Sequence, residues 1–216
     1  MSRFRLRLFP GLDGVLDAWA ADLNTFITPY QPNSIQFPNN APTAGQIVQT
    51  KVSAGHPVQL DVTTRVENGQ AQVAIYAMKP ERVQVTEENV GPLALDGHGN
   101  GYFPVARTQK MFCIEIWTDT REDRQPLSDL IFQRYGIAFD LTHTDGSTTK
   151  ILYDAQVDDD ADQTHTIYVR RFFFDVDFTL TQLWPTTNIT TPVLTAATSL
   201  VTSTTQTPPV EQASNL

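Results

Sequence analysis

The sequence lacks features that several protein classes require. Its 216 residues include one cysteine, Cys113, so an internal disulfide is impossible, and its apolar neighbours indicate a buried strand thiol. No run approaches the roughly 20 apolar residues of a membrane span. The N-terminal MSRFRLRLFP lacks the continuous apolar core of a secretory signal. We therefore expect a soluble chain that is not exported by itself.

Basic residues are scarce relative to acidic ones. There are 15 Lys and Arg against 24 Asp and Glu, which gives a formal net charge of −9. Phosphate contacts need Lys and Arg, so this balance argues against a dedicated DNA-binding protein. It remains compatible with the wall of a channel past which DNA slides, where a weak attraction is useful.

Catalytic motifs and metal-ligand spacings are also missing. The sequence has no GxSxG elbow, and its 4 histidines form no pair at helical ligand spacing and have no cysteine partner. Residues 97–101, GHGNG, have the glycine content of a phosphate loop but neither its GxxxxGK[ST] spacing nor its strand-to-helix context. These absences predict a protein that is not an enzyme and has neither a cofactor nor a metal.

The most conspicuous polar cluster is a run of acids: Asp158, Asp159, Asp160 and Asp162. It imitates the first positions of a calcium loop, but Gln163 replaces the required glycine and Val169 replaces the bidentate glutamate of the twelfth position. We interpret the run as a solvated turn or an electrostatic contact surface. A calcium- or ligand-binding accessory module is the alternative.

The C-terminal segment 185–216 has no aromatic residue, carries a single charge at Glu211, and is rich in threonine and proline. Such a segment buries too little apolar surface to offset an ordering cost of about 1–2 kcal/mol per residue. We predict an extended arm that is ordered only by partner molecules. Within it we assign Thr186, Leu194 and Leu200 to partner contacts.

Hydrophobic periodicity predicts the elements of the N-terminal half. The alternation over 3–9 indicates a short amphipathic strand, and the helical spacing of apolar residues over 13–27 indicates a helix. Long loops are expected at 29–46 and 80–104, because prolines or glycines interrupt both. Between them, two alternating runs flank Asn68-Gly69, which predicts a β-hairpin over about 57–77.

The second half has a clearer pattern. A strand over 110–117 precedes a helix that is capped by Asp119 or Thr120 and ends at Gly136. Strands at 137–142 and 150–153 flank a turn, and a long strand follows over 166–181, with a shift of phase near Arg170-Arg171 that predicts a β-bulge. The order predicts an α+β domain over 1–184: an antiparallel or mixed sheet with two helices on one face.

Basic residues concentrate at only a few positions: Arg3, Arg5, Arg7, Arg170 and Arg171. Next to phenylalanines they could contact nucleic acid, and simple solvation of a strand edge is a further interpretation. In a chain this acidic we favour ion pairs with the 158–162 run of an adjacent subunit, because interfaces bring complementary charges together.

Three passages resemble proteins from the neck of tailed bacteriophages. Residues 111–124, MFCIEIWTDTREDR, followed by Leu127, Leu130 and Ile131, are similar to their strand-to-helix unit, in which a strand ends in Trp and leads into a charged helix. Residues 166–181 resemble the long strand that closes their sheet, and residues 58–76 resemble their front hairpin.

The resemblance implies a tail terminator or a related head–tail joining protein. Such a subunit forms a ring, typically a hexamer, that contacts itself, the connector or stopper proteins and the tail tube, and lines the DNA channel without sequence-specific contacts. It would reside in the virion neck, and in the host cytoplasm during assembly, with no membrane partner. The loop 29–46 and the arm 185–216 are departures, so a connector or collar component of another neck layer remains an alternative.

Overall fold

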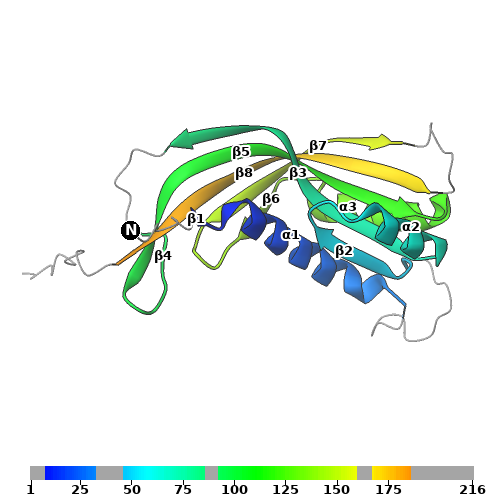
Figure 1. Ribbon diagram of the computed structural model, residues 1–216, viewed down its shortest axis with the longest axis horizontal. Coiled ribbons are helices and arrows are strands. Elements are labelled where there is room, and N and C mark those ends of the chain that lie inside the picture. Colours follow the sequence, from blue (N-terminus) through cyan, green and yellow to red (C-terminus); the bar gives the residue numbers. More distant parts are fainter. Residues whose placement is uncertain (1–7, 33–45, 86–91, 160–166, 186–216) are drawn as a thin grey trace, which may run out of the picture. The chain divides into compact units, whose positions relative to one another are not determined.

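A computed structural model shows an eight-stranded mixed sheet with three α-helices, so the predicted α+β class is confirmed (Figure 1). The structure describes residues 8–32, 46–85, 92–159 and 167–185. The sheet has the order β2-β3-β5-β8-β7-β6, with β1 paired to β8 and β4 to β5. The strands are β1 Leu8–Phe9, β2 Thr50–Ala54, β3 Ala71–Val85, β4 Ala94–Leu95, β5 Asn100–Thr118, β6 Phe139–Thr142, β7 Thr148–Asp158 and β8 Tyr168–Pro185.

The helices are α1 Gly11–Ile27, α2 Gln59–Glu67 and α3 Arg121–Tyr135, and a short 3-10 helix, Thr28–Tyr30, follows α1. Helix α3 begins as predicted, because the Thr120 hydroxyl accepts a hydrogen bond from the Asp123 amide at 3.1 Å. Helix α1 begins at Gly11, slightly before the predicted start. Among the described residues, none of the helices is long and apolar enough to span a membrane.

Helices α1 and α3 pack on one face of the sheet, as predicted, and we call this the covered face. Their apolar stripes meet inward-facing residues of β3, β5, β7 and β8 in one core. Trp19 of α1 lies at its centre, fully buried against the rings of Phe112, Tyr135 and Phe174. The core therefore ties the N-terminal helix to the second half of the chain.

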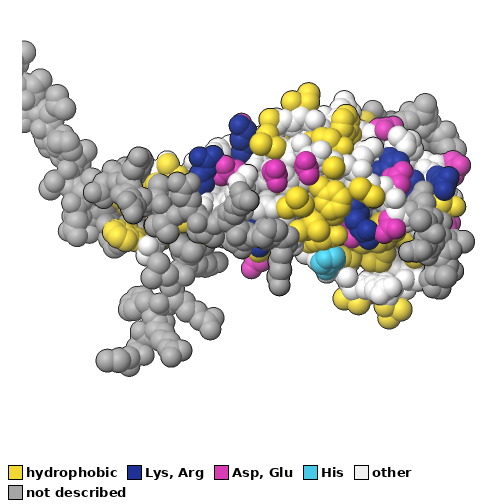
Figure 2. Space-filling model, turned by 90° about the horizontal axis from the view of Figure 1, so that it is seen from above, with side chains coloured by type: hydrophobic (Ala, Val, Ile, Leu, Met, Phe, Trp, Pro, Cys, Tyr) yellow, Lys and Arg dark blue, Asp and Glu magenta, His cyan; other side chains and the backbone are white. Residues whose placement is uncertain are grey.

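The opposite face of the sheet, which we call the second face, carries a smaller apolar cluster. Tyr76 and Cys113 are buried there beside the partly exposed Trp117 and Phe173. His56, which precedes α2, stacks on the Tyr76 ring at 3.7 Å between centroids. Figure 2 looks at the molecule from the side opposite α1 and shows hydrophobic side chains gathered at its centre, with charged ones around them.

The predicted hairpin over 57–77 is wrong, because its first strand is helix α2. Val62 and Val66, one helical turn apart, are the buried residues of this helix. Asn68-Gly69 ends the helix rather than turning a hairpin: Gly69 has φ +68°, its amide bonds to the Val66 carbonyl, and the Gln70 amide bonds to Arg65. Strand β3 then pairs in parallel with β2 through this helical crossover.

Two other predictions about strands are also corrected. Within the expected loop 80–104, the structure has strand at 80–85, 94–95 and 100–104, because β3 extends to Val85 and β5 begins at Asn100, and residues 86–91 lie outside the described residues. The bulge predicted near Arg170-Arg171 is absent from the described pairing, since both residues stay in register with β5 and β7. The irregularities lie instead between Pro104 and Ala106 and between Tyr153 and Ala155.

Candidate assembly interface

The structure brings together most of the charged residues that the sequence singled out in its second half. β7 ends at Asp158 and β8 begins at Tyr168, and the antiparallel register places Asp158 opposite Arg170. Adjacent residues on β8 point to opposite faces. Arg170 therefore lies on the covered face and Arg171 on the second face, and we call the surrounding region the β7–β8 junction.

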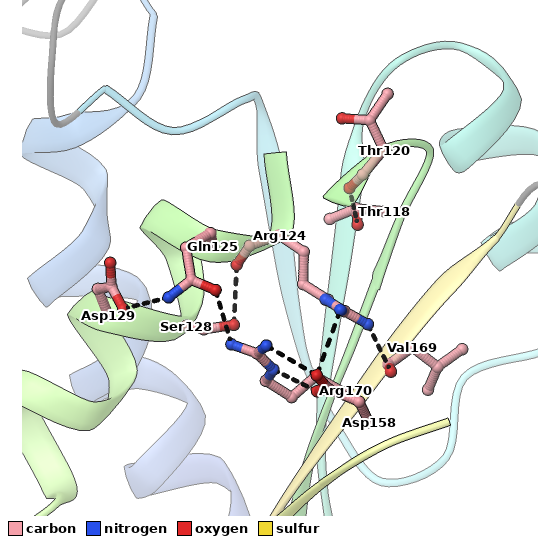
Figure 3. A network of polar contacts seen from close by, with 9 residues as sticks. All are labelled: Thr118, Thr120, Arg124, Gln125, Ser128, Asp129, Asp158, Val169 and Arg170. Atoms are coloured by element: carbon pink, nitrogen blue, oxygen red, sulfur yellow. Dashed lines mark hydrogen bonds and ion pairs between the residues drawn. The ribbon is translucent and has the colours of Figure 1, made fainter. Parts of the chain in front are cut away.

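On the covered face, Arg170 binds Asp158 in a bidentate pair (Figure 3). Its Nε donates to Oδ1 at 2.5 Å and its second terminal nitrogen donates to Oδ2 at 3.0 Å. Its other terminal nitrogen donates to the Gln125 side-chain oxygen of α3 at 3.2 Å. The arginine is only 9% exposed, so its charge is stabilised mainly by these contacts.

A second arginine, Arg124 of α3, converges on the same carboxylate. One terminal nitrogen of its guanidinium lies 3.4 Å from Oδ2 of Asp158, and the other donates a hydrogen bond to the Val169 carbonyl oxygen at 2.9 Å. The guanidinium carbon of Arg124 lies 6.0 Å from the centre of the Tyr168 ring, and that of Arg121 lies 5.5 Å from it, so both cations face the aromatic ring. These contacts join the first turn of α3 to the first residues of β8.

On the second face, Arg171 joins two acids. Its Nε donates to the buried Glu115 at 2.8 Å, and a terminal nitrogen donates to Asp159 at 2.7 Å. The other oxygen of Glu115 accepts a hydrogen bond from the Tyr76 hydroxyl at 2.8 Å. A chain of polar contacts thus links β3, β5, β8 and the residue after β7.

Burial determines the protonation of the groups in this cluster. Desolvation, with hydrogen bonding to Cys113 and Glu115, raises the pKa of Tyr76, and desolvation raises the pKa of the Cys113 thiol to about 11. Both groups are therefore neutral near pH 7. The thiol is a poor nucleophile here, because only the thiolate reacts, which agrees with its interpretation as a buried strand residue.

Arg170 and Arg171 of the junction find acidic partners within their own chain. The sequence predicted pairing between Arg170 or Arg171 and the acidic run of an adjacent subunit, but the structure pairs them with Asp158 and Asp159 of the same chain. Both oxygens of Asp158 accept hydrogen bonds from guanidinium groups, so a calcium ion would have to displace them. Among the described residues, no group of three or more His, Cys, Asp or Glu side chains is placed to hold a metal ion.

Several predicted contact residues lie outside the described residues: Arg3, Arg5, Arg7, Asp160, Asp162, Thr186, Leu194 and Leu200. Their assignment to interfaces stays a prediction. The same holds for residues 33–45 of the predicted 29–46 loop.

The glycine-rich residues 97–101 form a closed turn between β4 and β5. The Asp96 carboxylate accepts hydrogen bonds from the His98 amide at 2.7 Å and from the Asn100 amide at 3.0 Å. The Asn100 side chain donates to the same carboxylate, and this bond is the largest cause of the lowered pKa of Asp96. The His98 and Asn100 amides are therefore already used within the turn.

We expect the stability supplied by Asp158 to depend on pH. Hydrogen bonding from Arg170 is the largest cause that lowers the pKa of this carboxyl below its ordinary 3.8. A lowered folded-state pKa gives stability that is present above 3.8 and is lost as the pH falls through the lowered value. Urea unfolding at a series of pH values should therefore show the gap between the wild type and Asp158→Asn closing in acid. A gap that stays constant down to the most acidic folded condition would contradict this.

The two edges of the sheet are the other exposed features that suit assembly. In the described part of the chain, β2 pairs only with β3 and β6 only with β7, so each has one side without a partner strand, although the Gln31 side chain occupies the Thr50 amide on that side of β2. Lys51 of β2 and Asp140 of β6 are exposed on these edges. Sequence reasoning missed both, because β2 fell next to an expected loop and single charges in short strands carry no signal of their own.

Comparison of the sequence with models of known protein families and with curated proteins finds no match to either.

Proposed function

We propose that the protein is a structural subunit of a tailed-phage neck, a tail terminator or head–tail joining protein, which assembles into a ring around the DNA channel. The observation that carries this proposal is the pair of different open edges, β2 and β6, at opposite sides of one sheet. A repeated contact between two unlike surfaces closes into a ring when the rotation between copies allows it.

The strand-to-helix unit supports the same reading. β5 runs to Thr118 just after Trp117, a short turn carries the Thr120 cap, and the charged helix α3 follows. The long strand β8 pairs with β5 over almost its whole length, from Tyr168 to Pro185. These are the elements that carried the resemblance to phage neck proteins, and the third, residues 58–76, has a helix in place of its first strand.

The chemistry of the described residues favours a structural role over ligand binding. Asp158, the first position of the calcium-like pattern, is engaged by Arg170, and the adjacent Asp159 is engaged by Arg171. Asp160 and Asp162, the other acids of that pattern, lie outside the described residues. An acidic chain also suits a channel wall, because its net charge of −9 opposes tight adhesion of DNA.

The experiment is size-exclusion chromatography with light scattering on the full chain over a range of concentrations, with and without calcium. We expect a closed oligomer of defined mass, alone or on addition of tail-tube protein, and ring-shaped projections by electron microscopy. A monomer at all concentrations that remains monomeric with tail tubes, and that gains thermal stability with calcium, would overturn the proposal in favour of a calcium-binding module.

Deletion of residues 186–216 should separate folding from assembly. We expect the deleted chain to unfold cooperatively at an unchanged temperature, because the described core ends at β8. Assembly should weaken by about tenfold or more in the concentration at half-assembly, which corresponds to about 1.4 kcal/mol. An unfolded product, or assembly equal to that of the full chain, would contradict the assignment of this segment to partner contacts.

A further inference from the structure

We propose that the ring closes by pairing β6 of one copy with β2 of the next copy, in parallel, so that the sheet continues from subunit to subunit. The inference rests on the proposed function, since it names the surfaces that make the ring. The partner on each edge is a second copy of this chain. The edges β2 and β6 match in four respects: their outward backbone groups, the direction of their strands, their charges and their apolar residues.

The outward backbone groups of β6 follow from its pairing with β7. In an antiparallel pair, the residues that bond to the partner strand alternate with residues whose amide and carbonyl groups point away from it. The His143 amide bonds back to Ser147 in the β6–β7 turn. The backbone amide and carbonyl groups of Leu141 and His143 are therefore directed toward β7. Those of Asp140 and Thr142 are directed to the open side.

The outward groups of β2 follow in the same way. The Gln49 carbonyl accepts from Ala71 and the Gly55 amide donates to Ile75, so the odd-numbered residues of this segment bond to β3. The even-numbered residues Thr50, Val52 and Ala54 direct their groups to the open side. The Thr50 amide is already used, since it donates to the Gln31 side chain at 3.2 Å.

The two edges run in the same direction. β2 is parallel to β3, and the path from β3 through β5, β8 and β7 to β6 contains four antiparallel steps, so β6 is parallel to β2. When copies follow one another around a ring with their strands aligned, the new pair is therefore parallel. The continued sheet would be mixed, with one parallel pair at each junction between copies, and mixed sheets are common among large sheets.

One register uses every outward backbone group of β6, those of Asp140 and Thr142. With Asp140 opposite Lys51 of the next copy, the Asp140 amide meets the Thr50 carbonyl and the Asp140 carbonyl meets the Val52 amide. One step along, Thr142 meets the Val52 carbonyl and the Ala54 amide in the same way. On β2 this register leaves two outward groups unused: the Thr50 amide, which the Gln31 side chain already occupies, and the Ala54 carbonyl.

In this register the side chains of Lys51 and Asp140 lie on the same face of the sheet, the second face. Residues paired across neighbouring strands share a face, and Lys51 pairs with Gln72, which pairs with Trp117 of the second face. Asp140 pairs with Lys150, which pairs with Asp177 of the same face. Both Lys51 and Asp140 are exposed, and neither forms a salt bridge within the described part of the chain. The paired edges would bring these opposite charges side by side.

The covered face agrees as well. Phe139 and Leu141 of β6 and Val52 of β2 are partly buried residues that pack against the core under α1 and α3. Pairing the edges would join these apolar rows into one continuous layer. Ile137, which lies two residues before Phe139 and is 82% exposed, would gain a neighbouring surface.

Charge also disfavours the competing arrangement, in which like edges pair. Joining β6 to β6 would bring two Asp140 carboxylates together, and joining β2 to β2 would do the same for two Lys51 ammonium groups; like charges facing one another across strands are destabilising. Pairing the two unlike edges would also leave neither β2 nor β6 without a partner strand on its outer side once the ring closes. This removes the aggregation hazard of an unpaired edge.

A charge swap in the full chain tests the pairing. Lys51→Glu and Asp140→Lys should each raise the concentration at half-assembly by about fivefold or more. The double variant should return it to near the wild-type value, because the opposite charges are restored with exchanged positions. Asp175→Lys is the matched control: Asp175 is exposed on β8, within the sheet rather than at an edge, and this change should leave assembly as it was.

A cysteine pair tests the contact directly. Adjacent strands lie about 4.8 Å apart, within the Cα range in which a disulfide forms. Lys51→Cys with Asp140→Cys in one chain should give a ladder of oxidised oligomers on a denaturing gel, and a mixture of the two single variants should stop at dimers. Each single variant alone should remain monomeric on the gel, since Cys113 is buried.

The outcomes separate this inference from the proposed function. A ring by light scattering that shows no cross-link and no effect of the charge variants would overturn the edge pairing and leave the ring. Cross-linking of either single variant with itself would overturn it in favour of like-edge pairing. A chain that stays monomeric with and without tail tubes would overturn the function and this inference together.

Discussion

Replacing Trp19 by alanine is expected to lower the free energy of unfolding by about 3–5 kcal/mol, the range for truncation of a fully buried aromatic side chain. Trp19 has no exposed surface and touches aromatic rings of β5, α3 and β8. Its loss leaves a cavity where the N-terminal helix meets the second half of the chain. Urea unfolding followed by far-ultraviolet circular dichroism measures the change.

A matched tryptophan gives the control. Trp184 near the end of β8 is 53% exposed, so Trp184→Ala should change the free energy of unfolding by less than about 1 kcal/mol. Should Trp19→Ala fail to fold, Trp19→Phe keeps an aromatic ring in the same place and should remain measurable at a smaller cost. Equal effects at positions 19 and 184 would refute the central place of Trp19 in the core.

Replacing Asp158 by alanine is expected to lower the free energy of unfolding by about 3 kcal/mol, the lower end of the cost of breaking a buried ion pair. The side chains of Arg124 and Arg170 are only 5% and 11% exposed, and both are directed to this carboxylate. Without it, two like charges lie close together in a poorly solvated place. Asp158 itself is 43% exposed, which is why the upper end of the range is not expected.

The neighbouring aspartate is the control for that experiment. Asp159 binds Arg171, whose side chain is 35% exposed and keeps Glu115 as a second partner. Asp159→Ala should therefore cost less than about 1 kcal/mol, as is usual for exposed ion pairs. A loss at Asp158 no larger than that at Asp159 would show that the bidentate pair contributes little to stability.

The elements that the sequence predicted well are those whose caps, turn residues and hydrophobic spacing all lie within the element itself. Helix α3 has a threonine cap at Thr120, and the apolar residues of α1 recur at a strict helical spacing from Val15 to Ile27. The turn between β6 and β7 contains Gly146 at φ +78°, a conformation that glycine adopts without strain. In each case the local preference and the tertiary packing agree.

The predictions that failed rest on patterns with two physical solutions. Asn68-Gly69 suits a tight hairpin turn and also a helix end, and the β-branched residues over 58–66 carry buried positions at helical spacing as well as an alternation. In the folded chain, residues 59–67 form helix α2, which packs against β3. The apparent change of phase at Arg170 has a similar cause: the strand continues in register, and a charged residue occupies an inward position because Asp158 neutralises it.

The sequence by itself determined the α+β class, the two helices of the covered face and the long strand that crosses the sheet, because hydrophobic periodicity and caps act between residues near in the chain. Only the tertiary structure decided which charges meet, since β7–β8 pairing brings Asp158 to Arg170 and folding over β5 brings Glu115 to Arg171. The order of strands also left β2 and β6 at the edges. Edge position depends on long-range pairing, which no short stretch of residues encodes.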